Sequence, residues 1–369
     1  MSRADRIVYI RPASGGIQRY SQLIERLYAQ AEVPLNVITV DERRAAAGWR
    51  GLMLGIRLAL TSRGCMVHAE IGFHSATTVW ALLVWQWLKR GHYVLTIHEA
   101  EPVLESLFPM RWWGQRRRPI SSLINRLRRI LDGWWRQRLV GRLIQKADHI
   151  ITLQPDTTVF GRVGIYLPHP VYLSEAPAYQ QPPQRAVGFL GYWGDAKGIE
   201  VLIQAAGRLT AAGVQSRWII AGSTGDPHDE YSRSLRRLAS QSGATIEFPG
   251  SIPETSMLEY LQSLSVLVIP YRHNLAGLAS GMAVWATNAG VPVIASATPA
   301  LKAQLDGVAG WVPPDDPVAL GEAIAQHLEA PAKLTKLAAQ AQSRLLAERN
   351  DQAVSSALLK LVTKGQGTQ

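Results

Sequence analysis

The chain has 369 residues, which is too long for one ordinary hydrophobic core and about right for two domains of roughly 150–200 residues. Hydrophobic residues make up 47% of it and charged residues 18%, and the mean hydropathy of -0.01 excludes a chain that is disordered by composition. The formal net charge of +11 indicates an anionic partner, and the single cysteine, Cys65, excludes an internal disulfide framework.

Apolar segments are short in this sequence. The first apolar run, 7–10, falls below the roughly 7–15 residues of a signal-peptide core, and the segment 76–88 falls below the about 20 residues that span a bilayer. We therefore expect a cytoplasmic protein in which no helix crosses a membrane.

Short β-branched runs alternate with longer helical patterns along the first half of the chain. The helical stretches include 17–30, 76–90 and 119–147. The predicted strands are RIVYI (6–10), LNVITV (35–40), MVHAEI (66–71), YVLTIHE (93–99), HIITL (149–153) and GIYLPHPV (164–171). This rhythm predicts parallel βαβ units.

The second half repeats the rhythm after a stretch rich in proline and glutamine. Its predicted strands are AVGFLGYW (186–193), WIIAGS (218–223), TIEFPG (245–250), VLVIPY (266–271), PVIAS (292–296) and GWVPP (310–314). We predict an α/β protein of two doubly wound, Rossmann-like parallel-sheet domains that face each other across a cleft. The predicted boundaries are 1–172 for the first domain, 173–185 for a linker, 186–345 for the second domain, and 346–369 for a helix and tail that cross back to the first domain.

Candidate ligand-binding residues follow the predicted strands, where open parallel sheets bind their ligands. Gly15 and Gly16 open a helix after the first strand, so the backbone can approach an anion there. A plain tight turn explains the same two glycines. His98 stands at the end of the fourth strand, and there a structural and a ligand-facing histidine remain equally open.

The second half places cations at the same kind of position. Lys197 precedes a helix, where its charge opposes the helix dipole, so the pattern favours an anionic ligand. Arg272 follows another strand, and Ser280 with Gly281 opens the next helix. A guanidinium, a hydroxyl and free amides together describe a phosphate site, with simple packing of small residues as the alternative.

Several motifs in this order resemble the GT-B glycosyltransferases, specifically the retaining family 4, or glycosyl transferases group 1. They are GGIQRY, TIHE, ADHIITL, LPHPV, LGYWGDAKGIEVLIQA, IPETSMLEYLQSLSVLVIPY, AGVPVIAS and LDGVAGWVPPDDPVALGEAI. The resemblance implies a nucleotide-sugar donor, UDP- or GDP-linked, with no further cofactor and no metal.

The resemblance also implies roles for single residues. Gly15 and Gly16 match the loop near the donor diphosphate, His98 matches the histidine that faces the donor sugar, and Lys197 matches the lysine that neutralises the donor phosphates. Glu200 receives no role.

The sequence departs from the family pattern at three positions. Tyr192 stands where an arginine is common, and Gly277 and Trp285 stand where two glutamates hold the donor sugar and the ribose. We therefore expect Tyr192 in the donor site and the phosphates on Arg272, Ser280 and the amides of Gly281 and Met282. Loss of activity is the alternative.

The stretch RWWGQRRR, 111–118, combines tryptophans with arginines, and the basic helical pattern 119–147 follows it. Nucleic acid, an anionic membrane surface and a solvated basic helix are the three candidates for it. No nucleic-acid motif accompanies the charge, so we expect no nucleic acid and favour the membrane. The predicted membrane-surface residues are Trp112, Trp113, Arg116, Arg117 and Arg118.

The hypothesis from the sequence is a hexosyltransferase, peripheral at the inner face of the plasma membrane. It would move a sugar from a nucleotide-sugar to a glycan or polyprenyl-linked saccharide, in polysaccharide or exopolysaccharide biosynthesis. His98, Lys197 and Arg272 are its predicted catalytic residues. A nucleotide-sugar epimerase, a catalytically inactive partner subunit and a nucleic-acid-binding module remain alternatives.

Overall fold

The computed structural model describes residues 6–42, 47–62, 64–89, 91–99, 121–226, 228–272, 280–305 and 307–362, with the backbone alone for 47 and 121–132. The chain forms two compact units. Unit 1 comprises Met1–Pro170 and Asp351–Gln369, and unit 2 comprises Val171–Asn350.

Unit 1 alternates strands and helices from its first strand onward. Its elements are β1 (Ile7–Pro12), α1 (Gly16–Gln30), β2 (Leu35–Val40), α2 (Ala47–Thr61), β3 (Met66–Ile71), α3 (Ala76–Lys89), β4 (Tyr93–Ile97), α4 (Ser121–Lys146), β5 (His149–Thr152), β6 (Thr158–Val159), β7 (Arg162–Val163), β8 (Ile165–Tyr166) and α12 (Asp351–Val362).

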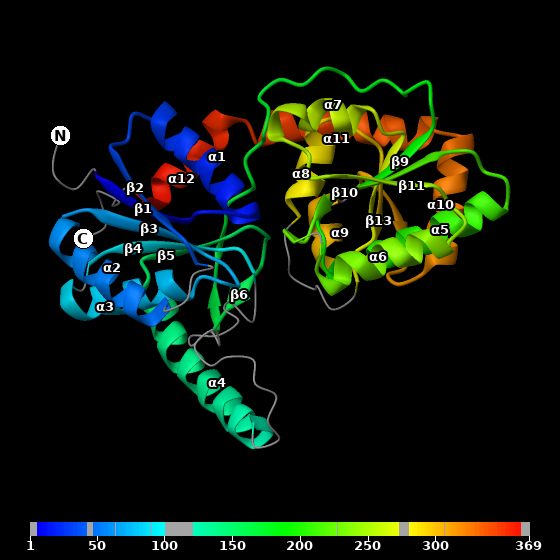
Figure 1. Cartoon of the computed structure of the whole chain (residues 1–369). Coiled ribbons are helices and arrows are strands. Elements are labelled where there is room, and N and C mark those ends of the chain that lie inside the picture. The colour runs from blue at the N-terminus through cyan, green and yellow to red at the C-terminus, as the bar shows by residue number, and fades with distance from the viewer. Residues whose placement is uncertain are drawn as a thin grey trace. The chain divides into compact units, whose positions relative to one another are not determined.

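Its main sheet is parallel, with strand order β2-β1-β3-β4-β5-β8. Helices α1 and α12 cover one face, and α2 and α3 cover the other (Figure 1). The strands β3 and β4 are buried along their whole length, as expected for strands covered on both faces. The order reverses at β1, because β2 lies on one side of it and β3 on the other.

Unit 2 repeats the same alternation. Its elements are β9 (Ala186–Tyr192), η3 (Asp195–Lys197), α5 (Ile199–Ala211), β10 (Arg217–Ser223), α6 (Glu230–Gln241), β11 (Ile246–Gly250), η4 (Glu254–Ser256), α7 (Met257–Gln262), β12 (Val266–Ile269), α8 (Gly281–Asn288), β13 (Val293–Ser296), α9 (Pro299–Leu305), β14 (Ala309–Val312), α10 (Pro317–Glu329) and α11 (Ala332–Glu348).

The sheet of unit 2 is also parallel, with strand order β11-β10-β9-β12-β13-β14. Its order reverses between β9 and β12, which places the chain segments after these two strands at the switch point where such sheets bind ligands. The predicted fold class, two doubly wound parallel-sheet α/β domains, is confirmed.

Two local features stand apart from the sequence-based expectations. Helix α2 lies outside the helical stretches named from the sequence, and its three glycines weaken a helical pattern. The strand predicted over 164–171 shortens to β8, since Pro168 and Pro170 lack the amide donors of a sheet ladder. The stretch 173–185 belongs to unit 2, where the Tyr179 hydroxyl donates to the Leu264 carbonyl at 2.9 Å, and its role as a linker stays a prediction.

The last helix, α12, packs on α1 in unit 1. Arg26 and Gln30 of α1 donate to the two oxygens of Asp351, at 2.8 and 2.9 Å, and the Ser355 hydroxyl approaches the Leu27 carbonyl at 3.4 Å. Asp351 stands in the first turn of α12, where a carboxylate also complements the helix dipole.

Candidate functional site

The start of α1 lies at the switch point of unit 1, directly after β1. Gly15 caps this helix with φ 94°, a left-handed conformation that favours glycine. A Cβ on Gly15 or Gly16 would have no atom of the described residues within 4 Å. The first turn carries no acidic residue and no side-chain cap, so its amides are available to an anion.

His98 follows β4 and is anchored by a carboxylate that the sequence analysis did not select. Its Nε2 lies 2.7 Å from Oε2 of Glu70, and its backbone amide donates to the Ile71 carbonyl at 3.0 Å. The ring of Tyr20, from α1, meets the imidazole edge-on at a centroid distance of 4.9 Å. Only 8% of the His98 side chain is exposed, so its orientation is fixed from three sides.

Glu70 is itself fully buried in β3 and belongs to a polar chain across the sheet. The Tyr9 hydroxyl donates to its Oε1 at 2.5 Å, and Nε2 of His68 lies 3.7 Å from the same oxygen. Burial raises the pKa of Tyr9, and the charge of Glu70 adds to this shift. Burial also lowers the pKa of His68. Tyr9 therefore stays a donor and His68 stays neutral near pH 7.

One signal in the sequence indicates this group of buried polar residues. His68 and Glu70 stand two residues apart in a strand that otherwise has only apolar residues, so they point to the same face. A carboxylate in a strand buried on both faces needs partners, and these partners come from β1 and from the residue after β4. The neighbouring strands supply these partners, and the order of the strands in the sheet was not visible in the sequence.

Lys197 lies at the switch point of unit 2, in the turn η3 between β9 and α5. The turn lies tightly against the end of β12, because a Cβ on Gly198 would come within 2.0 Å of the Pro270 carbonyl oxygen. Gly198 also has φ 62°, so only glycine fits there without strain. The Lys197 ammonium lies 3.9 Å from the centroid of the Tyr271 ring, and no carboxylate among the described residues pairs with it.

Arg272, three residues after β12, is surrounded by carboxylates. Its guanidinium contacts Asp195, and it lies 3.4 Å from Glu200 and 3.0 Å from Asp315. Glu200, to which the sequence analysis gave no role, therefore holds Arg272. The predicted phosphate contact of Arg272 stays a prediction, and any anion must compete with three carboxylates for this cation.

Ser280 is the N-cap of α8, and its polar groups already have protein partners. Its Oγ lies 3.0 Å from the Tyr271 hydroxyl and accepts from the Ala283 amide at 3.3 Å. Its own amide donates to Gln304 at 2.8 Å. Tyr271 thus joins Lys197, through its ring, to Ser280, through its hydroxyl, although the sequence analysis did not select it. Ser280 therefore holds Tyr271 and the start of α8 in place.

The first amides of α8 remain as donors. The amides of Gly281 and Met282 have no acceptor among the described residues, as expected for the first turn of a helix. Met282 lies near the end of β9, since its Cγ is 3.9 Å from the Cβ position of Gly191. Tyr192, predicted to be in the donor site, is 61% exposed at the same strand end.

Trp285, which stands where the family resemblance expects a ribose-binding glutamate, is buried in α8. Its ring stacks on Tyr172 at a centroid distance of 4.3 Å and an interplanar angle of 14°. The indole therefore packs within unit 2. The other substituted position, Gly277, lies outside the described residues.

The predicted membrane-surface residues Trp112, Trp113, Arg116, Arg117 and Arg118 also lie outside the described residues. Within the described ranges, no helix has the length and hydropathy needed to span a bilayer. The same ranges hold no group of three His, Cys, Asp or Glu side chains arranged to bind a metal.

Comparison with known proteins places this geometry in context. Residues 184–330 match the family model Glycosyl transferases group 1. No curated protein matches the chain in sequence. The solved structures that are similar include sucrose-phosphate synthase from Thermosynechococcus elongatus, with 18% identity, 97% of this chain and 98% of that chain covered, and a TM-score of 0.71.

Two further solved structures are similar to this chain over nearly its whole length. HepE from Anabaena, in complex with UDP and glucose, has 14% identity, 96% and 98% coverage and a TM-score of 0.68. A UDP-forming trehalose-phosphate synthase from Burkholderia xenovorans has 13% identity, 100% coverage of both chains and a TM-score of 0.67. At these identities the likeness establishes the fold. The chain therefore has the GT-B fold of these solved structures, and its residues 184–330, in unit 2, match the family model Glycosyl transferases group 1.

Proposed function

We propose that the protein is a glycosyltransferase that takes its sugar from a nucleotide-sugar. The observation that carries the proposal is the position of Lys197, a cation without a carboxylate partner among the described residues, at the switch point between β9 and β12. Ligands of open α/β sheets bind at this point, and the segment lies within the residues that match the family model. HepE, which shares the fold, binds UDP-glucose, and this supports a UDP-linked donor.

The proposed role of Lys197 is to stabilise the charge that develops on the departing diphosphate. The free amides of Gly281 and Met282 supply further donors at the start of α8, where the helix dipole favours an anion. Arg272 serves the same site once its carboxylate contacts rearrange. Such a set stabilises the leaving group without a metal, and we propose a metal-independent, retaining transfer.

His98 is proposed to contact the transferred sugar. Glu70 fixes its Nε2, so Nδ1 is the ring atom left for the substrate. The buried carboxylate holds the imidazole in one orientation, as a positioning group does for a substrate-binding histidine.

For the acceptor, we propose a glycan or a polyprenyl-linked saccharide, in polysaccharide or exopolysaccharide biosynthesis. A lipid-linked acceptor explains the basic excess of the chain, because the enzyme would work peripherally at the anionic cytoplasmic face of the plasma membrane. From Arg111 to Lys146 the sequence has eleven basic residues and one acidic residue, Asp132.

A catalytically inactive partner subunit is the second candidate, and the position of Trp285 favours it. A buried indole stacked on Tyr172 stands where the family resemblance expects a carboxylate. A subunit of this kind would retain the fold and lack turnover.

A thermal-shift panel of UDP-, GDP- and ADP-sugars tests the proposal. We expect one nucleotide class to raise the melting temperature of the wild type, and the Lys197→Ala variant to lose most of that shift. Arg208→Ala, on the exposed face of α5, is the matched control and should keep it. The proposal is wrong if no nucleotide-sugar stabilises the folded protein, and a donor that binds without transfer or hydrolysis would identify the inactive subunit.

A further inference from the structure

Helix α2 exposes a row of large apolar side chains. Trp49, Met53, Ile56 and Leu60 recur at helical spacing, with exposed fractions of 64%, 52%, 37% and 69%. At the end of the neighbouring helix α3, Trp87 is 81% exposed. Large apolar side chains exposed in a row on one helix, with another at the end of its neighbour, indicate a binding surface.

The core uses only the opposite side of α2. A Cβ on Gly51 would come within 2.3 Å of the Trp80 Cβ, and a Cβ on Gly55 within 2.6 Å of the Ala81 carbonyl oxygen, so these glycines let α2 lie directly against α3. The order of these contacts shows that the two helices run in parallel. Leu60 and Trp87 therefore lie at the same end of the pair, and the exposed row lies outside the core cluster of unit 1.

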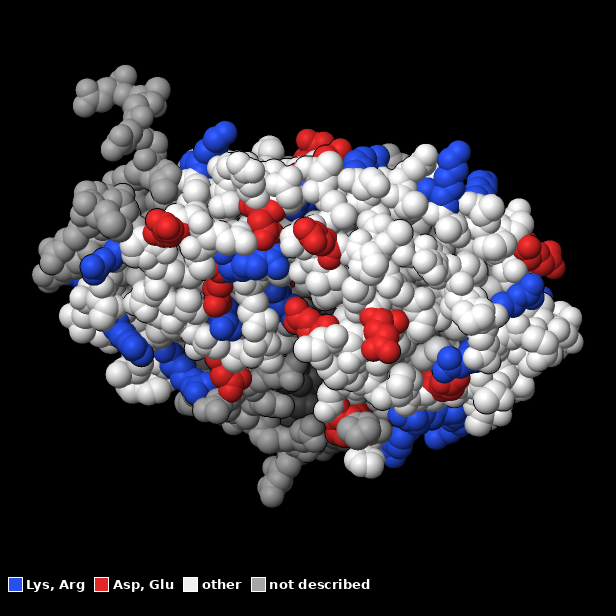
Figure 2. All heavy atoms as spheres, turned by 90° about the horizontal axis from the view of Figure 1, so that it is seen from above, with Lys and Arg blue, Asp and Glu red and all other residues white. Residues whose placement is uncertain are grey.

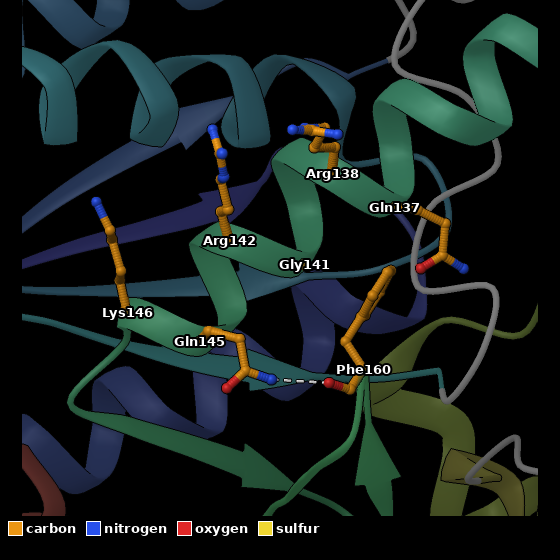
Figure 3. A pocket seen from close by; sticks show the side chains of 7 residues that line it. All are labelled: Gln137, Arg138, Gly141, Arg142, Gln145, Lys146 and Phe160. Carbon is orange, nitrogen blue, oxygen red and sulfur yellow. Dashed lines mark hydrogen bonds between the residues drawn. The ribbon is translucent and has the colours of Figure 1, made fainter.

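A basic face lies on α4, which packs against α3. Val140, Leu143 and Ile144 of α4 are buried in the core of unit 1. Arg138, Arg142 and Lys146 project together from another side of the helix (Figure 3). They line an open groove of about 530 Å³ with Phe160, and the described residues that line it include no carboxylate.

The exposed tryptophans of α4 continue this face. Trp134 and Trp135 are 50% and 41% exposed. Arg138 lies over the Trp134 ring at 5.1 Å. Indole and guanidinium side by side are typical of surfaces that contact lipid headgroups.

Basic residues dominate these helices, and the one acidic residue in their sequences is Asp132 of α4. The sequences of α2, α3 and residues 133–146 contain no Asp or Glu, and their basic residues include Arg50, Arg57 and Lys89. The face seen in Figure 2 differs, because basic and acidic side chains alternate there. Helix α4 projects to the bottom of Figure 1, away from the viewer in Figure 2.

We propose that the exposed row of α2 and α3 and the basic face of α4 form one docking surface for an anionic lipid bilayer. The apolar side chains enter the boundary between headgroups and acyl chains, and the cations of α4 bind headgroup phosphates. A second copy of the chain fits less well, since it would bring the like charges of Arg57 and Lys89 together. The inference rests on the proposed function, whose lipid-linked acceptor gives the surface its purpose.

Flotation of the full chain with vesicles of phosphatidylcholine, with and without phosphatidylglycerol, tests the surface. We expect the wild type to bind the anionic vesicles and to keep a bound fraction at high salt. Leu60→Ser with Trp87→Ser should reduce the salt-resistant fraction about tenfold, because it removes exposed apolar contact. Val163→Ser with Val318→Ser, which are exposed apolar residues elsewhere, should leave it unchanged.

Two matched sets of substitutions test the contribution of positive charge to vesicle binding. Changing Arg138, Arg142 and Lys146 to glutamine should abolish the preference for anionic vesicles. The same loss of charge at the exposed Arg208, Arg233 and Arg237 of unit 2 should preserve it.

Two results would overturn the docking surface. One is vesicle binding that none of these variants changes, and the other is a dimer in sedimentation velocity that Leu60→Ser with Trp87→Ser dissociates. The donor-induced thermal shift separates the two proposals. All surface variants should retain it, and a wild type that binds vesicles but no nucleotide-sugar would support the docking surface and contradict the proposed function.

Discussion

The carboxyl edges of the two sheets follow the same strand topology but hold their charged side chains differently. In unit 1, His98 and Glu70 form a buried pair, with 8% and 0% of their side chains exposed. In unit 2, Lys197 and Arg272 lie in partly exposed turns. The first edge is fixed by hydrogen bonds to the core, and the second is held by ion pairs and a ring contact at the surface.

This difference separates two kinds of role. A buried polar network positions one side chain, and its removal leaves unsatisfied groups in the core. A partly exposed cation retains the freedom to bind a ligand, and its removal affects the ligand more than the fold.

The largest effect is expected at Glu70. Glu70→Leu leaves the Tyr9 hydroxyl and His98 Nε2 without their acceptor, and should lower the free energy of unfolding by about 2–5 kcal/mol. Urea denaturation measures this change, with the exposed Glu329→Leu as the control. Equal stability of Glu70→Leu and the wild type would show that the buried network does not support unit 1.

Lys197 and Arg272 should differ in their effect on the donor. Lys197→Ala removes a hydrogen bond to a charged group, worth about 1.5–3 kcal/mol, so we expect turnover and donor affinity to fall at least about tenfold. Arg272→Ala should cost less than Lys197→Ala, because three carboxylates already neutralise the guanidinium. Donor titration by calorimetry measures both, and unchanged kinetics in both variants would contradict the assignment of this site.

His98 should show whether a positioned side chain also acts in the site. His98→Ala leaves Glu70 Oε2 without its donor, so it should reduce stability by about 1–3 kcal/mol as well as activity. His98→Gln retains an amide donor and should restore folding, while turnover stays at least about tenfold down. A glutamine variant with full turnover would assign His98 to structure alone.

The smallest effect is a dependence of stability on pH. Burial lowers the pKa of His68 in unit 1 and of His327 in unit 2, where His327 Nε2 donates to the Ser265 carbonyl. Below about pH 6.5 the unfolded histidines bind protons that the folded ones resist, so stability falls as pH falls, by up to about 1.4 kcal/mol per histidine and pH unit. Denaturation at several pH values should show a shallower slope for His327→Gln, and an unchanged slope would locate the effect elsewhere.

Several features of this protein follow from the sequence alone. The alternation of β-branched and helical segments determined the parallel-sheet fold, because buried strands and amphipathic helices must cover each other's apolar surfaces. Gly15, Gly16 and Lys197 indicated strand ends that bind ligands, since glycines let the backbone approach an anion and a cation there opposes the helix dipole.

The tertiary structure decided the pairings. Glu70 meets His98 because β3 and β4 are neighbours in the sheet, and Arg272 meets Asp195 and Asp315 because three separate strand ends converge. No helix was named from the sequence at α2, and only the packing of α2 on α3 showed which of its apolar residues remain exposed. Local periodicity sets which residues share a face, whereas the neighbour that covers the face depends on the order of the strands.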